Sequence, residues 1–406
     1  MSSLSDSAAA KLWLSQFNDA ERPVAASLVD ELLLVGADEF YSGMKQLLDR
    51  VMASRPDDRP AALYAEREIE TEQGAIRPIF GEPGDRRATG LGPAPLLFDP
   101  KAPEVGSEGP IANLITGYHR LHGDAVLDHP GPDLLRDRRA GPVVIVADFI
   151  GSGNRVWEML EAFRTVRSVR SWRSYRLVNF YVLAYAGTEE GIALVRRNRL
   201  RPQVLTVAGC PTLHQAFRGD ARNAVLRLCH AYPPDYRFPL GFGASSALIA
   251  FAHGIPDNAP AILHSDFEGW KPLFPNRSAL ASSADFPRSN RAELIARSAR
   301  MLRVHDAQRY LADSRGRRWI QTMLVLAALD AGARTRELVS AQTRISLGTV
   351  DETLEFTRIA RWTKENNALT PLGRAELQRL RRRRARMPVL PTERKPFYYP
   401  TQLRAR

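Results

Sequence analysis

The chain has 406 residues, of which 44% are hydrophobic, so it is long enough to bury two or three hydrophobic cores. No apolar run approaches the ~20 residues that a membrane span requires, and the first residues lack the basic start and continuous apolar core of a signal peptide. We therefore expect a soluble, cytoplasmic protein with no membrane partner.

The net charge of +12 is unevenly distributed along the chain. Residues 1–300 contain 35 Lys and Arg against 35 Asp and Glu, whereas residues 301–406 contain 22 against 10. This surplus predicts that the C-terminal region binds nucleic acid, either DNA or DNA–RNA. Cys210 and Cys229 form no CxxC motif and no cluster with histidine, so we predict buried thiols and neither a disulfide nor a metal site.

The sequence predicts helices in the N-terminal part of the chain and an α/β fold in the part after it. Apolar residues follow a helical spacing over 7–54, which predicts an N-terminal helical segment at 1–60. Residues 61–300 are predicted as one domain that begins with strands and loops. Within it, GSEG at 106–109 precedes a helix in IANLITGYHRLHG. A loop that opens onto a helix N-terminus suits an anion, but Glu108 would repel one, so a simple helix-entry turn is the alternative.

The middle of the chain predicts a parallel sheet. A strand at Val143–Val146, a helix over about 155–166 and the strands LVNFYVLAYAG and QVLTVAG follow in succession. This order is typical of a doubly wound α/β fold. The segment GFGASSALIAFAHG at 241–254 predicts a second Gly-rich loop that leads into an apolar helix.

Residues 301–386 predict a winged-helix domain, and 387–406 a basic, Pro-rich tail. Three helices are predicted in the segments WIQTMLVLAALDAG, TRELVSAQT and SLGTVDETLEFTRIA, and Ser346 is the expected N-cap of the third. A hairpin and a last helix follow. The third helix begins with acids at Asp351 and Glu352, so we expect backbone contacts rather than base readout. The predicted nucleic-acid-binding residues are Arg344, Arg358, Arg361, Lys364, Arg381, Arg382, Arg383 and Arg384. Protein docking through this domain is the alternative.

The stretch VVIVADFIGSGNRV at 143–156 places a buried strand before a small, Gly-rich loop. It resembles the phosphate loop of phosphoribosyltransferases, and the chain is similar to phosphoribosyltransferase-like effectors of bacterial conflict systems, including anti-phage retrons. The resemblance covers roughly residues 10–300, through GSEG, ADFIGSG, SWRSYRLVNFYVLAY, GFGASSALIAFAHGIPDNAPAIL and WKPLFPNR. The alternative is that Gly151 and Gly153 only allow a tight turn.

The resemblance implies a phosphorylated ribose ligand, with Mg²⁺ accompanying a phosphoribosyl compound. The implied ligand-binding residues are Asp148, Gly151, Ser152, Gly153, Asn154, Arg155, Gly106, Ser107 and Gly109. Ala147 and Gly151 stand where an active transferase carries acids, so we expect binding to persist and ordinary transferase activity to be weak or absent. No catalytic residue is assigned.

Three further patterns bear on function. Arg164, Arg167, Arg170, Arg173 and Arg176 recur every three residues with Trp172 and Tyr175 between them, which on one continuous helix would form a basic stripe. We expect the helix to end before Ser171, which would leave a solvated helix end. The spacing of His253, Asp257, His264 and Asp266 matches no metal motif and indicates structural roles. No GxSxG occurs, so a serine hydrolase is not supported.

The sequence therefore predicts a phosphoribosyltransferase-like defence effector that binds a phosphorylated ribose compound. Its winged helix would hold it on nucleic acid, such as the reverse-transcribed DNA of a complex with a reverse transcriptase. The alternative is a transcription regulator in which the α/β domain senses a ligand and the winged helix binds an operator.

Overall fold

The computed structural model describes residues 4–55, 58–81, 87–95, 108–233, 236–277, 294–295, 297–304 and 307–382. The chain divides into two compact units. The first combines residues 1–290 with 335–351, and the second combines 291–334 with 352–406. This division differs from the predicted boundaries at 60, 300 and 386, because the N-terminal helices and one short segment of the predicted winged helix pack in the first unit. Among the described residues, no helix is long and apolar enough to cross a membrane.

The described part of the first unit contains a five-stranded parallel sheet in the order β5-β2-β6-β7-β8. The strands are β2 (Ala61–Ala65), β5 (Val126–Asp128), β6 (Pro142–Ile150), β7 (Asn179–Gly187) and β8 (Gln203–Gly209). The central pair β6 and β7 is in register from Pro142↔Asn179 to Ile150↔Gly187. The first six residues of β6 are all buried, because both faces of the sheet are covered by helices. The predicted parallel α/β fold is confirmed.

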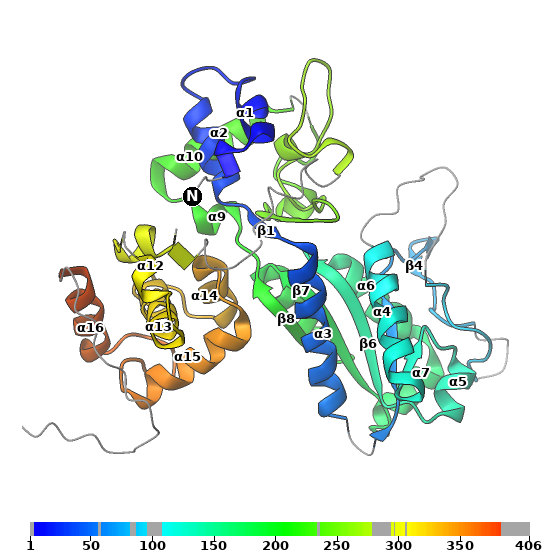
Figure 1. Ribbon diagram of the computed structural model, residues 1–406. Helices are drawn as coiled ribbons and strands as arrows, with labels where there is room; N and C mark the ends of the chain where they lie inside the picture. Colours follow the sequence, from blue (N-terminus) through cyan, green and yellow to red (C-terminus); the bar gives the residue numbers. More distant parts are fainter. Residues whose placement is uncertain are drawn as a thin grey trace, which may run out of the picture. The chain divides into compact units, whose positions relative to one another are not determined.

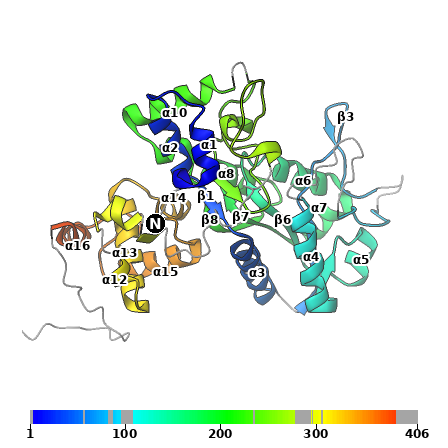
Figure 2. The same cartoon turned by 45° about the horizontal axis from the view of Figure 1, so that its top comes forward.

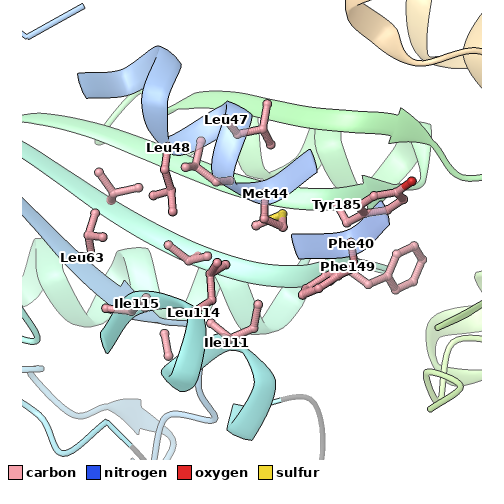
Figure 3. Packing of buried hydrophobic residues seen from close by; sticks show 14 of the residues in the cluster. Phe40, Met44, Leu47, Leu48, Leu63, Ile111, Leu114, Ile115, Phe149 and Tyr185 are labelled. Atoms are coloured by element: carbon pink, nitrogen blue, oxygen red, sulfur yellow. The ribbon is translucent and has the colours of Figure 1, made fainter. Parts of the chain in front are cut away.

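Helices cover the two faces of the sheet (Figure 1). The helices are α3 (Ala37–Ala53) and α4 (Glu108–His122) on one face, and α5 (Pro132–Asp137), α6 (Asn154–Thr165), α7 (Arg167–Ser174) and α8 (Glu189–Arg196) on the other. Figure 3 shows the first face, where Phe40, Met44 and Leu48 of α3 lie over the sheet beside Ile111 and Ile115 of α4. Burial of these large apolar side chains is the main term that stabilises the layer.

A second core lies in a cap formed by residues 4–35 and 211–277. Its elements are α1 (Ala8–Leu14), α2 (Arg22–Asp30), β1 (Leu33–Val35), α9 (Leu213–Ala216), α10 (Gly219–Ala231) and β9 (Ile249–Phe251). Trp13 and Phe17 pack on Trp270, and β1 pairs in parallel with β9. Figures 1 and 2 both show α1, α2 and α10 grouped together. The predicted N-terminal helical segment is therefore divided between the cap and the sheet.

The apolar run at 247–252 was predicted as a helix, and this prediction is wrong. The structure has a 3-10 turn at Phe242–Ala244 and then the strand β9. A short apolar run does not distinguish a buried strand from a buried helix, and pairing with β1 decides for the strand. The remaining short elements are Leu4–Asp6, Gly123–Ala125, Ala261–Leu263 and Pro275–Arg277 (3-10), and β3 (Thr71–Glu72) with β4 (Ala75–Ile76).

The second unit is helical. Its elements are a π-helical turn (Ser298–Leu302), α12 (Ala307–Tyr310), α13 (Ser314–Asp330), the later part of α15 (Leu347–Ile359) and α16 (Pro371–Arg382). α13 is buried over most of its length, and Asp313 caps it by accepting from the Gly316 amide at 2.7 Å. The bridge Thr363↔Leu369 forms the predicted hairpin before α16. With α14 (Arg336–Thr343), the elements follow the predicted winged-helix order.

Candidate functional site

The strand order reverses between β2 and β6. From β2 the chain goes out to the edge strand β5 and returns to β6 on the other side of β2. In open parallel sheets, ligands bind beyond the carboxyl ends of the strands at such a reversal, because the two following loops diverge there. In this protein these loops begin at Glu66 and Gly151. The fold therefore points to the same loop as the sequence.

The loop after β6 presents backbone amides at the start of α6. Gly153 is the N-cap with φ of 81°, a left-handed conformation that favours glycine. The Asn154 amide is 3.4 Å from Ser152 Oγ, and the amides of Ser152 and Gly153 have no acceptor among the described residues. Amides at a helix N-terminus form a suitable site for a phosphate.

Close packing explains the glycines of this loop without a ligand. A Cβ on Gly151 would lie 2.0 Å from Asn258 Oδ1, and a Cβ on Gly153 would lie 2.6 Å from the Gly191 carbonyl oxygen. The Thr188 hydroxyl also donates to the Gly151 carbonyl at 2.6 Å. The tight turn thus accounts for the glycines, and the case for a phosphate rests on the Ser152 and Gly153 amides, which have no acceptor among the described residues, and on the nearby charges.

Arg155 and Glu66 form an ion pair across the strand reversal. Arg155 Nε lies 3.0 Å from Glu66 Oε1, and the Glu66 side chain is 8% exposed whereas that of Arg155 is 47% exposed. The arginine can therefore reach solvent, and an anion, while one side stays on the carboxylate. Our sequence analysis missed Glu66, although an acid directly after the buried run AALYA is a usable signal.

Asp148 is paired with a histidine from the cap. His253 Nε2 lies 3.2 Å from Asp148 Oδ2, and the two side chains are 18% and 13% exposed. The His253 ring stacks on Phe251 with centroids 5.0 Å apart and also contacts Phe40. His253 was assigned a structural role from sequence, but the structure brings it to the predicted ribose-binding acid.

A buried network fixes the end of β2 beside Glu66. The Ala65 amide donates to His129 Nε2 at 2.8 Å, so His129 Nδ1 carries the proton and donates to Asp128 Oδ1 at 2.5 Å. Thr116 donates to the second Asp128 oxygen at 2.8 Å. Burial by itself would raise the pKa of Asp128, but the hydrogen bonds from His129 and Thr116 outweigh it, and the pKa is lowered.

The other predicted ligand residues are placed as follows. Gly109 lies in the first turn of α4 and is buried, and Asn154 is the exposed first residue of α6. Gly106 and Ser107 lie outside the described residues. Ser152 is partly exposed under the cap, where a Cβ on Gly243 would come within 3.1 Å of its Cβ. The cap thus contacts the loop directly.

The acids of the site already have partners, and the two thiols of the chain are buried. In the described segments, no three His, Cys, Asp or Glu side chains gather so as to hold a metal ion. Glu66 and Asp148 already face Arg155 and His253, so Mg²⁺ fits this site only as a companion of ligand phosphates. Cys210 and Cys229 are buried free thiols, as predicted, and burial raises the pKa of each to about 12.

α14 packs on the edge strand β8 inside the first unit. A Cβ on Gly209 would lie 2.0 Å from the Glu337 carbonyl oxygen, and the Gly209 amide donates to Ser340 Oγ at 2.9 Å. Arg196 Nη2 donates a hydrogen bond to Glu337 Oε1 at 2.8 Å. A cavity of about 170 Å³ lies between α3, β8 and α14, and burial raises the pKa of its Glu39 despite a hydrogen bond from Tyr185.

The predicted nucleic-acid residues fall into three groups. Arg344 is a correction: its side chain is 2% exposed and donates to the Glu31 carbonyl at 2.5 Å, because it caps α14 in a packed region. Arg358, Arg361 and Lys364 are exposed. Arg381 pairs with Asp330 at 3.2 Å, Arg382 ends α16, and Arg383 and Arg384 lie outside the described residues.

Two comparisons with family models identify the class of protein. Residues 127–276 match the model PRTase-CE, and residues 323–405 match a model described as wHTH-PRTase associated. The first match contains the loop at 151–155 and His253, and the second contains α14, α15 and α16. Neither the curated proteins nor the solved structures include a match. The chain is therefore a phosphoribosyltransferase-like protein with a C-terminal winged-helix region.

Proposed function

We propose that this protein is an effector of a bacterial anti-phage defence system, associated with a retron, that binds a phosphorylated ribose compound and is held on nucleic acid by its winged helix. The loop at 151–155, whose Ser152 and Gly153 amides have no acceptor among the described residues, is the observation that carries the ligand part. The defence role rests on the sequence resemblance. A reverse transcriptase encoded beside this gene is the simplest test of that role, and a neighbourhood of nucleotide-metabolism genes would count against it.

The ligand is held at three points. The amides of Ser152 and Gly153 and the guanidinium of Arg155 bind the 5-phosphate, and Asp148 accepts a ribose hydroxyl. His253 Nε2 already contacts the Asp148 carboxylate, so the ribose hydroxyl either shares that carboxylate with His253 or displaces the imidazole from it. Ala147 and Gly151 supply no second acid, and ordinary transferase activity stays weak or absent.

Nucleic acid is bound through the exposed cations of the winged helix. Arg358, Arg361 and Lys364 lie at the end of α15 and in the following turn, and the sequence adds the charges of Arg381–Arg384 from the last turn of α16 onward. Such contacts hold the phosphate backbone and give little sequence preference.

The packing of α14 on β8 supports a second candidate function. A ligand-sensing transcription regulator needs a physical link between its sensor and its DNA-binding helices. Gly209, Ser340 and the cavity beside them form such a link within the first unit. A defined operator, bound with affinity that depends on the ligand, would favour this function over the effector.

Replacing Asp148 with alanine should weaken binding of a phosphorylated ribose compound by about 10- to 100-fold, which is the usual contribution of a hydrogen bond to a charged group. Ser152→Trp should block the loop altogether. The measurement is the thermal shift of the purified protein with phosphoribosyl pyrophosphate, mononucleotides and NAD.

Asp220→Ala, which removes an exposed acid in the cap, is the matched control and should keep the wild-type shift. Equal ligand shifts in wild type, Asp148→Ala and Ser152→Trp would show that the loop is only a turn. Robust pyrophosphate release from phosphoribosyl pyrophosphate and a nucleobase would overturn the statement on transferase activity.

Replacing Arg381, Arg382, Arg383 and Arg384 with serine should weaken binding to DNA or RNA and flatten its salt dependence. Each lost phosphate contact lowers the log–log slope by about 0.9 on duplex DNA, so the loss is up to about four units. Because Arg381 pairs with Asp330, we expect a value nearer three. Fluorescence anisotropy at several salt concentrations measures the slope.

The control for this variant removes the same charge from the cap by changing Lys11, Arg222, Arg227 and Lys271 to glutamine, all four being exposed. It should leave the slope nearly unchanged. An unchanged slope in the Arg381–Arg384 variant would instead remove this segment from the binding surface and favour protein docking by the winged helix.

A further inference from the structure

The arginine repeat at 164–176 is divided between two helices. α6 ends at Thr165, Val166 is extended with φ and ψ of −68° and 118°, and α7 runs from Arg167 to Ser174. The predicted helix end before Ser171 is confirmed, because α6 ends at Thr165, and a second helix, α7, then runs through that residue. Arg164 is on the α6 side of the break and pairs with Glu161.

Five arginines lie on α7, just after it, and in the turn at 199–201 that α7 contacts, and we name them the arginine patch: Arg170, Arg173, Arg176, Arg199 and Arg201. Arg173 Nε donates to the Leu200 carbonyl at 3.1 Å, which joins the end of α7 to the turn at 199–201. Arg170, Arg176, Arg199 and Arg201 are exposed. In the part of the chain that the structure describes, none of the five forms an ion pair.

The charge of this surface is local. Between residues 164 and 201 the sequence has nine arginines and two acids, although residues 1–300 are balanced overall. The two acids, Glu189 and Glu190, begin α8, and Glu189 accepts a hydrogen bond from Thr335 at 2.8 Å. Unneutralised cations this close together repel each other, so they indicate a polyanionic partner.

Aromatic rings lie among the arginines. Tyr175 is 76% exposed and stands between Arg173 and Arg176 in the sequence. Trp172, one turn earlier, is partly buried beneath the Arg136 guanidinium, 5.6 Å from the ring centroid. Figures 1 and 2 both show α7 beside α5, the helix that carries Arg136. An exposed tyrosine among cations is suited to stacking on an unpaired base.

We propose that the arginine patch and Tyr175 bind single-stranded nucleic acid. The arginines hold successive phosphates and Tyr175 stacks on a base, which a duplex would keep within its own stack. The patch lies just before β7 and β8, at the amino ends of the strands, whereas the loop at 151–155 follows the carboxyl end of β6. A strand bound there leaves the ligand site open. The proposal uses none of the residues of the winged-helix surface.

The test compares two variants of the full chain by anisotropy with a labelled single-stranded oligonucleotide and its duplex. Changing Arg170, Arg176 and Arg199 to glutamine should weaken single-strand binding by about 10- to 100-fold and lower the salt slope by about two, at roughly 0.7 per phosphate. Tyr175→Ala should weaken single-strand binding by at least about 5-fold, with an unchanged slope and an unchanged duplex affinity.

The matched control changes Arg222, Arg227 and Lys271 in the cap to glutamine, which removes the same charge. Circular dichroism and thermal melting confirm that each variant is folded. If the patch variant loses no more affinity than this control, the patch does not bind nucleic acid. If Tyr175→Ala has no effect, or weakens duplex binding equally, the assignment to single strands is wrong. Both outcomes are independent of the ligand shift that tests the site at 151–155.

Discussion

The substitution Gly191→Ala is expected to destabilise the protein by about 2–3 kcal/mol and to abolish the thermal shift given by a phosphorylated ribose ligand. Gly191 lies in the first turn of α8, where helix propensity alone would favour alanine by about 1 kcal/mol. Its Cβ, however, would lie 2.1 Å from the Gly151 carbonyl oxygen. Because the obstacle is backbone, either α8 or the loop has to move.

Gly117→Ala in α4 is the matched control. A Cβ there has no neighbouring atom within 4 Å, so the free energy of unfolding of this variant should rise by up to about 1 kcal/mol. Urea unfolding of both proteins gives the two free-energy changes, which are expected to have opposite signs. A neutral or stabilising effect of Gly191→Ala would mean that α8 does not hold the loop, and the proposed ligand site would lose its support from packing.

The substitution Gly209→Ala should release α14 from the first unit. The added Cβ would lie 2.0 Å from the Glu337 carbonyl oxygen and 3.0 Å from the Ala341 amide nitrogen, which are again backbone atoms. The hydrogen bond from the Gly209 amide to Ser340 and the ion pair of Arg196 with Glu337 would be strained or lost. We expect the free energy of unfolding to fall by about 2–4 kcal/mol and amide exchange over residues 336–343 to become faster.

Gly348→Ala, in the first turn of α15, serves as its control because the space around Gly348 is open. It should be neutral or slightly stabilising and leave exchange in α14 unchanged. If Gly209→Ala leaves the protection of α14 as it is in wild type, α14 is not fastened to β8. The second candidate function would then lose the observation that favours it.

Local patterns in the sequence were sufficient for the main architecture. The run VVIVA is apolar at every position, as a strand covered on both faces must be, and it predicted the parallel sheet. The apolar helix at α13, the short α14 and the hairpin before α16 follow spacings of a few residues, so the winged-helix order was also predictable. Gly151 and Gly153 mark a tight turn because few other residues fit there.

Only the tertiary structure decided which of these residues meet. His253 reaches Asp148 across 105 residues of sequence, and Glu66 reaches Arg155 because the strand order places β2 beside β6. The helix predicted after Gly243 became β9 because β1, more than 200 residues earlier, offers it a partner. Arg344 has the composition of a surface cation and is buried because α14 packs on β8. Short-range periodicity reports the faces of one element, whereas pairing between distant elements depends on the burial and hydrogen bonding of the whole fold.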